Sequence, residues 1–140
     1  MQPTPSAAAV LICPAPAMAL PGESWNREPF LDYLTRPVAQ SWLHHYLDPP
    51  QYANPLASPI HGDLRHLPPI LMQAGGNEGL LDEIEGLADT MRQAKVELTY
   101  HVTNEMPHVW HLFIGLIPEA DAAIQEIADF IQKKTAQKRA

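Results

Sequence analysis

Apolar and polar positions follow one another along the chain in patterns that predict three strands and three helices. Short apolar runs without alternation predict strands at about residues 8–13 and 70–74, and such runs are typical of strands buried on both faces of a sheet. Residues 97–103 alternate apolar and polar side chains, which indicates a half-buried strand. Helical spacing of apolar residues marks the segments 37–46, 80–94 and 118–132. The pattern predicts the α/β class, with about three parallel strands and flanking helices.

Proline divides the chain into two unlike parts. Thirteen of the 15 prolines lie in residues 1–69, which predicts loops and short isolated elements there, including a loop at residues 23–25. Only Pro107 and Pro118 lie further on, so the second part can hold regular structure. The 140 residues are enough for one modest domain, and the basic end, residues 133–140, is expected to be a frayed tail.

Composition narrows the class of function. The net charge is −7, and 46% hydrophobic residues against 18% charged ones indicate a globular protein. The negative charge argues against a partner such as nucleic acid or an anionic membrane surface. The single cysteine, Cys13, excludes an internal disulfide framework. No apolar run approaches the length of a membrane span, and the run ending at Cys13 fits a strand better than a signal peptide, so we expect no transmembrane segment and a cytoplasmic location by default.

Two residues that follow predicted strands are the candidates for chemistry. Glu78 comes after the second strand and His108 after the third, 30 residues later. Taken alone, an acid at a helix start usually complements the helix dipole, and a loop histidine is usually a hydrogen-bonded, half-buried residue. As a pair, they follow the order acid then histidine of the serine–acid–histidine hydrolases, with both at one sheet edge. Asp82 and Glu83, further along the helix, are expected to be solvated.

A metal site is the main chemical alternative. His108 and His111 are three residues apart, and His44 and His45 are adjacent, which directs their side chains apart. The sequence contains no HExxH motif, and its one cysteine has no CxxC partner. It also contains no phosphate-binding loop and no GxGxxG motif. We therefore expect neither a metal ion nor a cofactor.

Four stretches carry a resemblance to a known family: residues 54–59, 63–76, 78–83 and 106–110. Over about residues 7–132 the chain resembles the C-terminal third of the hormone-sensitive-lipase-like esterases, also called α/β-hydrolase fold-3 esterases, near the fungal steryl-acetyl-hydrolase-like members. In that family the catalytic acid opens a D/E-x-L-x-D-D/E motif, and the catalytic histidine lies in a G/M-x-H motif about thirty residues later. The resemblance therefore implies that Glu78 and His108 are catalytic. Asp82 remains an alternative to Glu78 as the catalytic acid, if the motif is read one motif position later.

The chain also departs from the family pattern. The nucleophile motif GxSxG is absent, since Ser6, Ser24, Ser41 and Ser58 all lack its glycines, and the HGGG oxyanion loop is absent as well. Residues 13–16, Cys-Pro-Ala-Pro, replace the usual Pro-Trp-x-Asp-like continuation. The chain is thus expected to hold two members of a catalytic triad without the serine.

Two functions from different classes follow. The resemblance implies a carboxylic-ester hydrolase that acts through an acyl-enzyme on short-to-medium acyl esters or acetylated lipids, with this chain supplying the acid and the histidine. The alternative is a non-catalytic truncated hydrolase module that binds a ligand or joins a partner completing the sheet. In either case we expect the isolated chain to be inactive. We also expect it to fold poorly, because the apolar strand at residues 7–13 would be an exposed edge.

Overall fold

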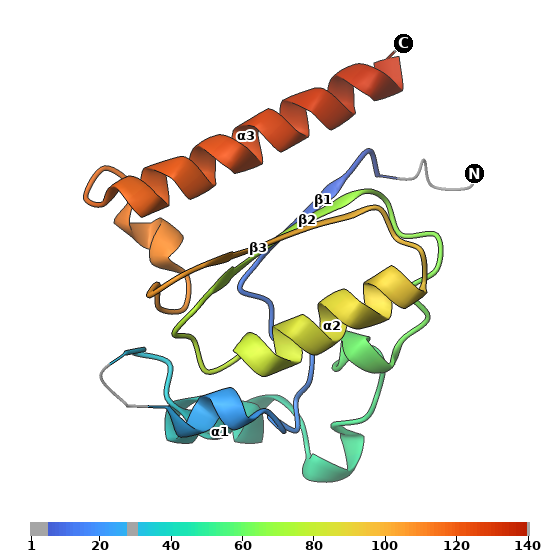
Figure 1. The fold of residues 1–140 in the computed structure, drawn as a ribbon. Coiled ribbons are helices and arrows are strands. Elements are labelled where there is room, and N and C mark those ends of the chain that lie inside the picture. Colours follow the sequence, from blue (N-terminus) through green and yellow to red (C-terminus); the bar gives the residue numbers. More distant parts are fainter. Residues whose placement is uncertain (1–5, 28–30, 140) are drawn as a thin grey trace.

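Three parallel strands form the centre of the molecule. The computed structural model describes residues 6–27 and 31–139 (Figure 1). The strands lie in the order β1 (Ala9–Ile12), β2 (Ile70–Gly75) and β3 (Leu98–Thr103). Both pairings are parallel, so the carboxyl ends of the three strands share one edge of the sheet. The predicted α/β class, with three parallel strands, is confirmed.

The register aligns the apolar runs that the sequence singled out. Ile70 at the start of β2 pairs with Ala9 of β1 and with Leu98 of β3. Near the other end, Gln73 pairs with both Ile12 and His101. β2 is therefore the central strand, and each of its six residues is buried.

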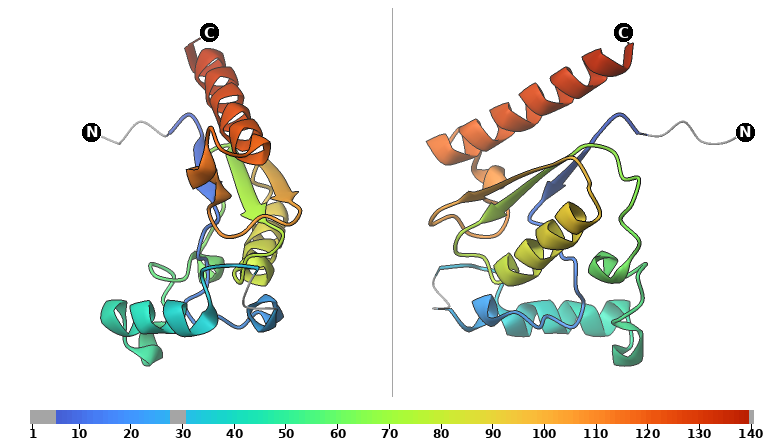
Figure 2. Two further views of the ribbon diagram at one scale, coloured as in Figure 1. Left: turned by 90° about the vertical axis from the view of Figure 1, so that its left-hand side faces the viewer. Right: turned by 45° about the vertical axis from the view of Figure 1, so that its right-hand side comes forward.

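Two helices, α2 (Leu81–Gln93) and α3 (Pro118–Arg139), cover the two faces of the sheet, and a third, α1 (Arg36–Tyr46), lies outside them. α2 crosses one face and α3 the opposite face, while α1 lies beyond α2, away from the sheet (Figures 1 and 2). α3 is longer than predicted, because residues 133–139 continue the helix instead of fraying. These residues include good helix formers, and Lys134 Nζ lies 2.5 Å from Glu97 Oε1, just before β3.

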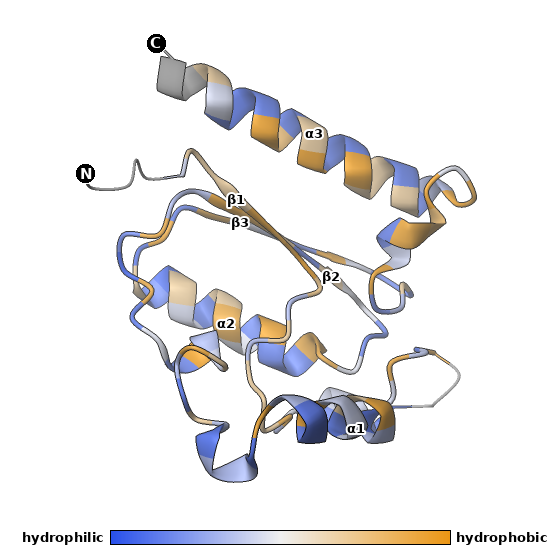
Figure 3. Cartoon of the chain, turned by 180° about the vertical axis from the view of Figure 1, so that it is seen from behind, coloured by the Kyte–Doolittle hydropathy of each residue, from blue (hydrophilic) through white to orange (hydrophobic). Residues whose placement is uncertain are grey.

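The apolar stripe predicted for α2 forms the main core. Leu80, Ile84, Leu87 and Met91 retain no more than 3% of their exposure and pack against the buried residues of β2. The spacing of three and four residues places them on one side of the helix. Figure 3 shows the matching colour pattern, with alternating apolar and polar bands along α2 and α3. A smaller cluster around Trp110 packs between α3 and the sheet.

β1 differs from its prediction. It was expected to be buried on both faces, yet its residues are half-buried, and Ile12 keeps 37% of its exposure. The physical reason is its position: among the described residues β1 has β2 as its only neighbour, so it is the edge of the sheet.

In its described residues, the long connection between β1 and β2 holds α1 and three short 3-10 helices: η1 (Glu23–Asn26), η2 (Pro49–Gln51) and η3 (Pro59–His61). η1 occupies the segment that was predicted to be loop. In the described part of the chain, no helix combines the length and the apolar character needed to cross a membrane.

Candidate active site

The loops that carry the predicted acid and histidine leave the sheet at the same edge and touch each other. Glu78 follows β2 and His108 follows β3. The N–H of Asn77 donates to the carbonyl of Met106 at 3.0 Å, which ties the two loops together. A Cβ at Gly75 would lie 2.4 Å from that carbonyl oxygen, so only glycine allows this close approach.

Glu78 and His108 form a hydrogen-bonded pair. Glu78 Oε2 lies 2.9 Å from His108 Nδ1. The Glu78 side chain is fully buried, whereas the His108 side chain is 18% exposed. The other carboxylate oxygen, Oε1, accepts the N–H of Gly75 at 2.6 Å. A carboxylate that accepts the Nδ1 proton fixes the tautomer of the ring and leaves the lone pair of Nε2 free to take a proton.

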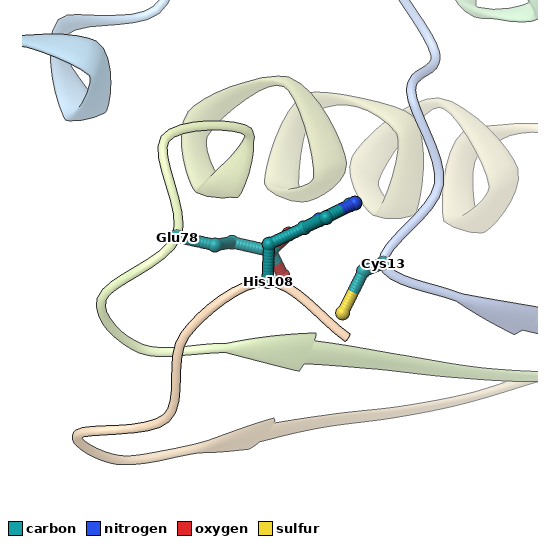
Figure 4. A group of neighbouring side chains, drawn as sticks. All are labelled: Cys13, Glu78 and His108. Atoms are coloured by element: carbon teal, nitrogen blue, oxygen red, sulfur yellow. The ribbon is translucent and has the colours of Figure 1, made fainter. Parts of the chain in front are cut away.

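The backbone directly after His108 is strained. Val109 has a φ of 50°, in the left-handed region that β-branched residues rarely adopt. Its N–H donates to Cys13 Sγ at 3.3 Å, and Cys13 also has a positive φ, of 44°. Figure 4 shows the outer ring nitrogen of His108 pointing away from Glu78. Strain of this kind often accompanies functional sites.

Cys13 completes a group of three potential metal ligands. One donor atom each from Cys13, Glu78 and His108 lies within 4.8 Å of the others. Burial, and then the negative charge of Glu78, raise the pKa of the Cys13 thiol well above its usual range. A metal ligand must be the thiolate, and both oxygens of Glu78 already accept hydrogen bonds. This donor set suits a hydrogen-bonded pair better than a resident metal ion.

The other histidines considered as ligands lie elsewhere. His111 is buried against Trp110, with ring centroids 4.0 Å apart, and its Nε2 lies 2.8 Å from Gln73 Oε1. His44 and His45 are exposed on α1. Within the described residues, the structure does not gather these histidines into one ligand set.

Glu83 was expected to be solvated, and that expectation is wrong. It retains 3% of its exposure, and its Oε1 accepts hydrogen bonds from Trp25 Nε1 at 2.7 Å and from the N–H of Gly22 at 3.0 Å. Helical spacing explains the burial, because Glu83 lies three residues after Leu80 and four before Leu87, on the apolar side of α2. Glu83 therefore anchors the connection between β1 and α1 to α2.

Asp82, the alternative acid, has a similar anchoring contact. Its Oδ2 accepts the N–H groups of Glu23 and Ser24, at 2.7 and 2.9 Å. The Nδ1 of His108 is paired with Glu78 instead. The geometry thus places Glu78, and not Asp82, beside the histidine.

Sequence reasoning missed two residues at this site. Cys13 directly follows β1. Because the carboxyl ends of parallel strands share one sheet edge, its position after the first strand could have placed it at this site. Asp32 contacts the loops of both Glu78 and His108, but its partners lie 47 and 76 residues away, so no local pattern marks it.

An apolar pocket of about 300 Å³ reaches His108. Its walls come from the connection after β1, from α1 and from the start of α2. They include Leu20, Trp25, Leu34, Leu43, Leu80 and the exposed Trp42. Apolar walls with a polar group at one end are typical of small-molecule sites, and this volume is at the small end of their range.

Comparison with known proteins agrees with this geometry. The family described as "alpha/beta hydrolase fold" matches residues 2–112. An acetyl-hydrolase of Streptomyces hygroscopicus is 38% identical in an alignment 136 residues long, which covers 94% of this chain and 44% of that protein. An esterase of Acinetobacter venetianus is 36% identical over 92 residues, 65% of this chain and 30% of that protein. The chain thus spans less than half the length of these relatives.

Solved structures show the same relationship. An esterase of the bacterial hormone-sensitive lipase family superposes with a TM-score of 0.86 and is 36% identical in sequence. The match covers 91% of this chain and 43% of the esterase chain. A hormone-sensitive lipase from a metagenome library gives a TM-score of 0.87 and 27% identity, over 94% of this chain and 45% of its own. The chain therefore belongs to the α/β-hydrolase fold family, and it corresponds to the C-terminal part of the fold of hormone-sensitive-lipase-type esterases.

Proposed function

We propose that Glu78 and His108 are the acid and the general base of a carboxylic-ester hydrolase. The observation that carries the proposal is the 2.9 Å contact between Nδ1 of a partly exposed histidine and a carboxylate that has no exposure. A buried carboxylate in this position holds the imidazole in one orientation and stabilises the imidazolium that forms during acyl transfer. Relatives described as an esterase and an acetyl-hydrolase support the same chemistry.

On this proposal, the serine nucleophile and the oxyanion donors come from a strand that pairs with the free side of β1. Ile12, near the end of β1, is 37% exposed, and the next residue, Cys13, lies beside the His108 loop. A parallel strand added at this edge would end close to Nε2 of His108. Because the relatives are more than twice as long as the part they share with this chain, they have sequence to supply such a strand.

The reaction then follows from the pair. Nε2 of His108 takes the proton of the serine hydroxyl while the serine oxygen bonds to the ester carbonyl carbon. When the tetrahedral intermediate collapses, the carbon–oxygen bond to the alcohol breaks, and Nε2 gives its proton to the departing alcohol. Water repeats the two steps on the acyl-enzyme and releases the acid. Glu78 stays ionised throughout and stabilises the charged ring.

The pocket beside His108 indicates an ester with a small apolar group. Its walls are formed mainly by leucine and tryptophan side chains, and its volume of about 300 Å³ fits a short-to-medium chain or a similar apolar fragment. Burial of each CH₂ group contributes about 0.8 kcal/mol to binding. An acetylated lipid is compatible with the same pocket if its acyl group is the small part of the ester.

A hybrid enzyme tests this function. This chain replaces the matched part of the Streptomyces hygroscopicus acetyl-hydrolase, so that the other protein supplies the remaining strands. We expect the hybrid to hydrolyse p-nitrophenyl acetate and butyrate, and the 140-residue chain alone to be inactive. His108→Ala should abolish turnover in the hybrid, whereas His45→Ala, on the exposed side of α1, should leave it unchanged.

A folded hybrid whose turnover survives His108→Ala would overturn the proposal. A folded hybrid that binds the ester without hydrolysing it would favour the alternative, a non-catalytic module that keeps the pocket. A cooperative thermal transition in each variant shows that the protein compared is folded.

A further inference from the structure

Asp32 accepts backbone hydrogen bonds from His108 and from Gly79, the residue that follows Glu78. Its Oδ1 accepts the N–H of His108 at 3.0 Å, and its Oδ2 accepts the N–H of Gly79 at 3.1 Å. Gly79 directly follows Glu78 in the sequence. One carboxylate therefore bridges the two loops next to the acid and at the histidine itself.

The segment around Asp32 is itself fixed in place. Oδ1 also accepts the N–H of Leu34 at 3.3 Å, which closes a short turn of the kind that aspartate commonly makes. Leu34 is buried in the main core, with 5% exposure. The neighbouring Tyr33 sets the edge of its ring against His108, with the centroids 6.2 Å apart. The segment thus meets His108 both at the backbone and at the ring.

A carboxylate is suited to this bridge for a simple reason. It offers two acceptor oxygens and no donor, and each oxygen can accept more than one hydrogen bond. Asparagine has nearly the same shape but only one acceptor oxygen, and its NH₂ group would face one of the N–H donors. Replacement by asparagine must therefore release one of the two loops, and replacement by alanine must release both.

We propose that Asp32 is a positioning residue that sets the separation of Glu78 and His108 by holding the backbone of both loops. This inference rests on the proposed function for its effect on turnover, but the geometry it concerns can be measured without turnover. The Glu78–His108 contact is made by two side chains on separate loops, so a shift of either loop lengthens it. A misplacement of about 1 Å costs roughly 100-fold in rate.

The test compares Asp32→Asn and Asp32→Ala with a matched control, Asp63→Asn. Asp63 makes the same kind of turn, accepting the N–H of Arg65 at 3.1 Å, but it lies on the surface and contacts neither loop. The first readout is the low-field proton resonance of His108 Nδ1, recorded by NMR in the folded hybrid. The second readout is kcat and KM of the hybrid.

We expect the His108 Nδ1 resonance to shift or broaden in Asp32→Asn and to vanish in Asp32→Ala. We expect kcat to fall about 10-fold in the asparagine variant and about 100-fold in the alanine variant, with KM changed less than threefold. Asp63→Asn should change neither readout. An unchanged Nδ1 resonance and kcat in both Asp32 variants, or a loss confined to the thermal midpoint, would overturn the inference.

The two proposals fail in different ways. If the hybrid shows no turnover that depends on His108, the proposed function is wrong, while the Nδ1 resonance still tests the bridge. If turnover depends on His108 but not on Asp32, the function stands and the positioning role is wrong.

Discussion

Replacement of Glu78 by glutamine probes the pair at a single atom. The carboxylate uses one oxygen for the N–H of Gly75 and the other for His108 Nδ1, at 2.6 and 2.9 Å. The amide can keep only one of these contacts. If its NH₂ group faces Gly75, two buried donors meet and a hydrogen bond is lost, at a cost of about 1–3 kcal/mol. We therefore expect the amide oxygen to stay with Gly75 and the NH₂ group to face Nδ1.

That orientation reverses the tautomer of His108. Nδ1 becomes the acceptor, Nε2 carries the proton, and the ring cannot take a proton from a serine. Loss of the orienting carboxylate in a serine triad costs roughly 10⁴ in kcat. Allowing for a minority of correctly oriented rings, we expect a fall of about 10³–10⁴ in kcat for Glu78→Gln, which is about 4–5.4 kcal/mol of transition-state stabilisation.

The assay is the initial rate of ester hydrolysis by the hybrid at saturating substrate. The matched control is Glu85→Gln, which makes the same change at an exposed position of α2 and should leave kcat unaltered. We expect KM to change little, because Glu78 does not line the apolar pocket. Retention of more than a third of kcat by a folded Glu78→Gln protein would refute the reasoning.

Three further outcomes follow, each measured as the midpoint of thermal or urea unfolding of the hybrid. Glu83→Ala should cost about 2–4 kcal/mol, because it leaves the buried donors of Trp25 and Gly22 unpaired; a loss below 1 kcal/mol would contradict the anchoring role. Gly79→Ala should destabilise by about 1–3 kcal/mol, since its Cβ would lie 2.5 Å from the Trp25 ring, and an unchanged midpoint would show that the ring can move. Burial lowers the pKa of His111 below its usual 6.5. At pH values just below 6.5, the unfolded chain therefore binds a proton at His111 that the folded chain does not bind. The free energy of unfolding should therefore fall as pH drops below about 6.5, by up to about 1.4 kcal/mol per pH unit. His111→Gln should flatten this pH dependence. If the stability of the variant falls just as steeply with pH, other groups cause the effect.

The sequence predicted the elements whose signals are local. The stripe of α2 and the alternation in β3 come from neighbouring residues, so their positions follow from periodicity alone. Glu78 and His108 could be paired because parallel strands bring their carboxyl ends to one edge. The burial of Glu83 also follows from helical periodicity, because its position between Leu80 and Leu87 places it on the apolar side of α2.

Contacts that depend on the path of irregular segments could not be predicted. Asp32 reaches residues 47 and 76 positions away through an irregular connection whose path depends on the packing of Leu34 and Trp25. Lys134 in the last turns of α3 pairs with Glu97 just before β3, a contact between residues 37 positions apart that no local pattern marks. The exposure of β1 depends on its place at the edge of the sheet, and the apolar run itself carries no sign of whether it is an edge or a central strand.

On the proposed function, Glu78 and His108 act on a serine carried by a strand beside β1. The most direct measurement isolates the native protein from its source cells with an antibody to α3, labels it with a fluorophosphonate, and identifies the labelled peptide by mass spectrometry. We expect a labelled serine in a GxSxG sequence, present in the same chain or in a firmly bound partner, and a labelling rate that falls when His108 is replaced. A homogeneous species of 15.5 kDa that carries no labelled serine would contradict the claim.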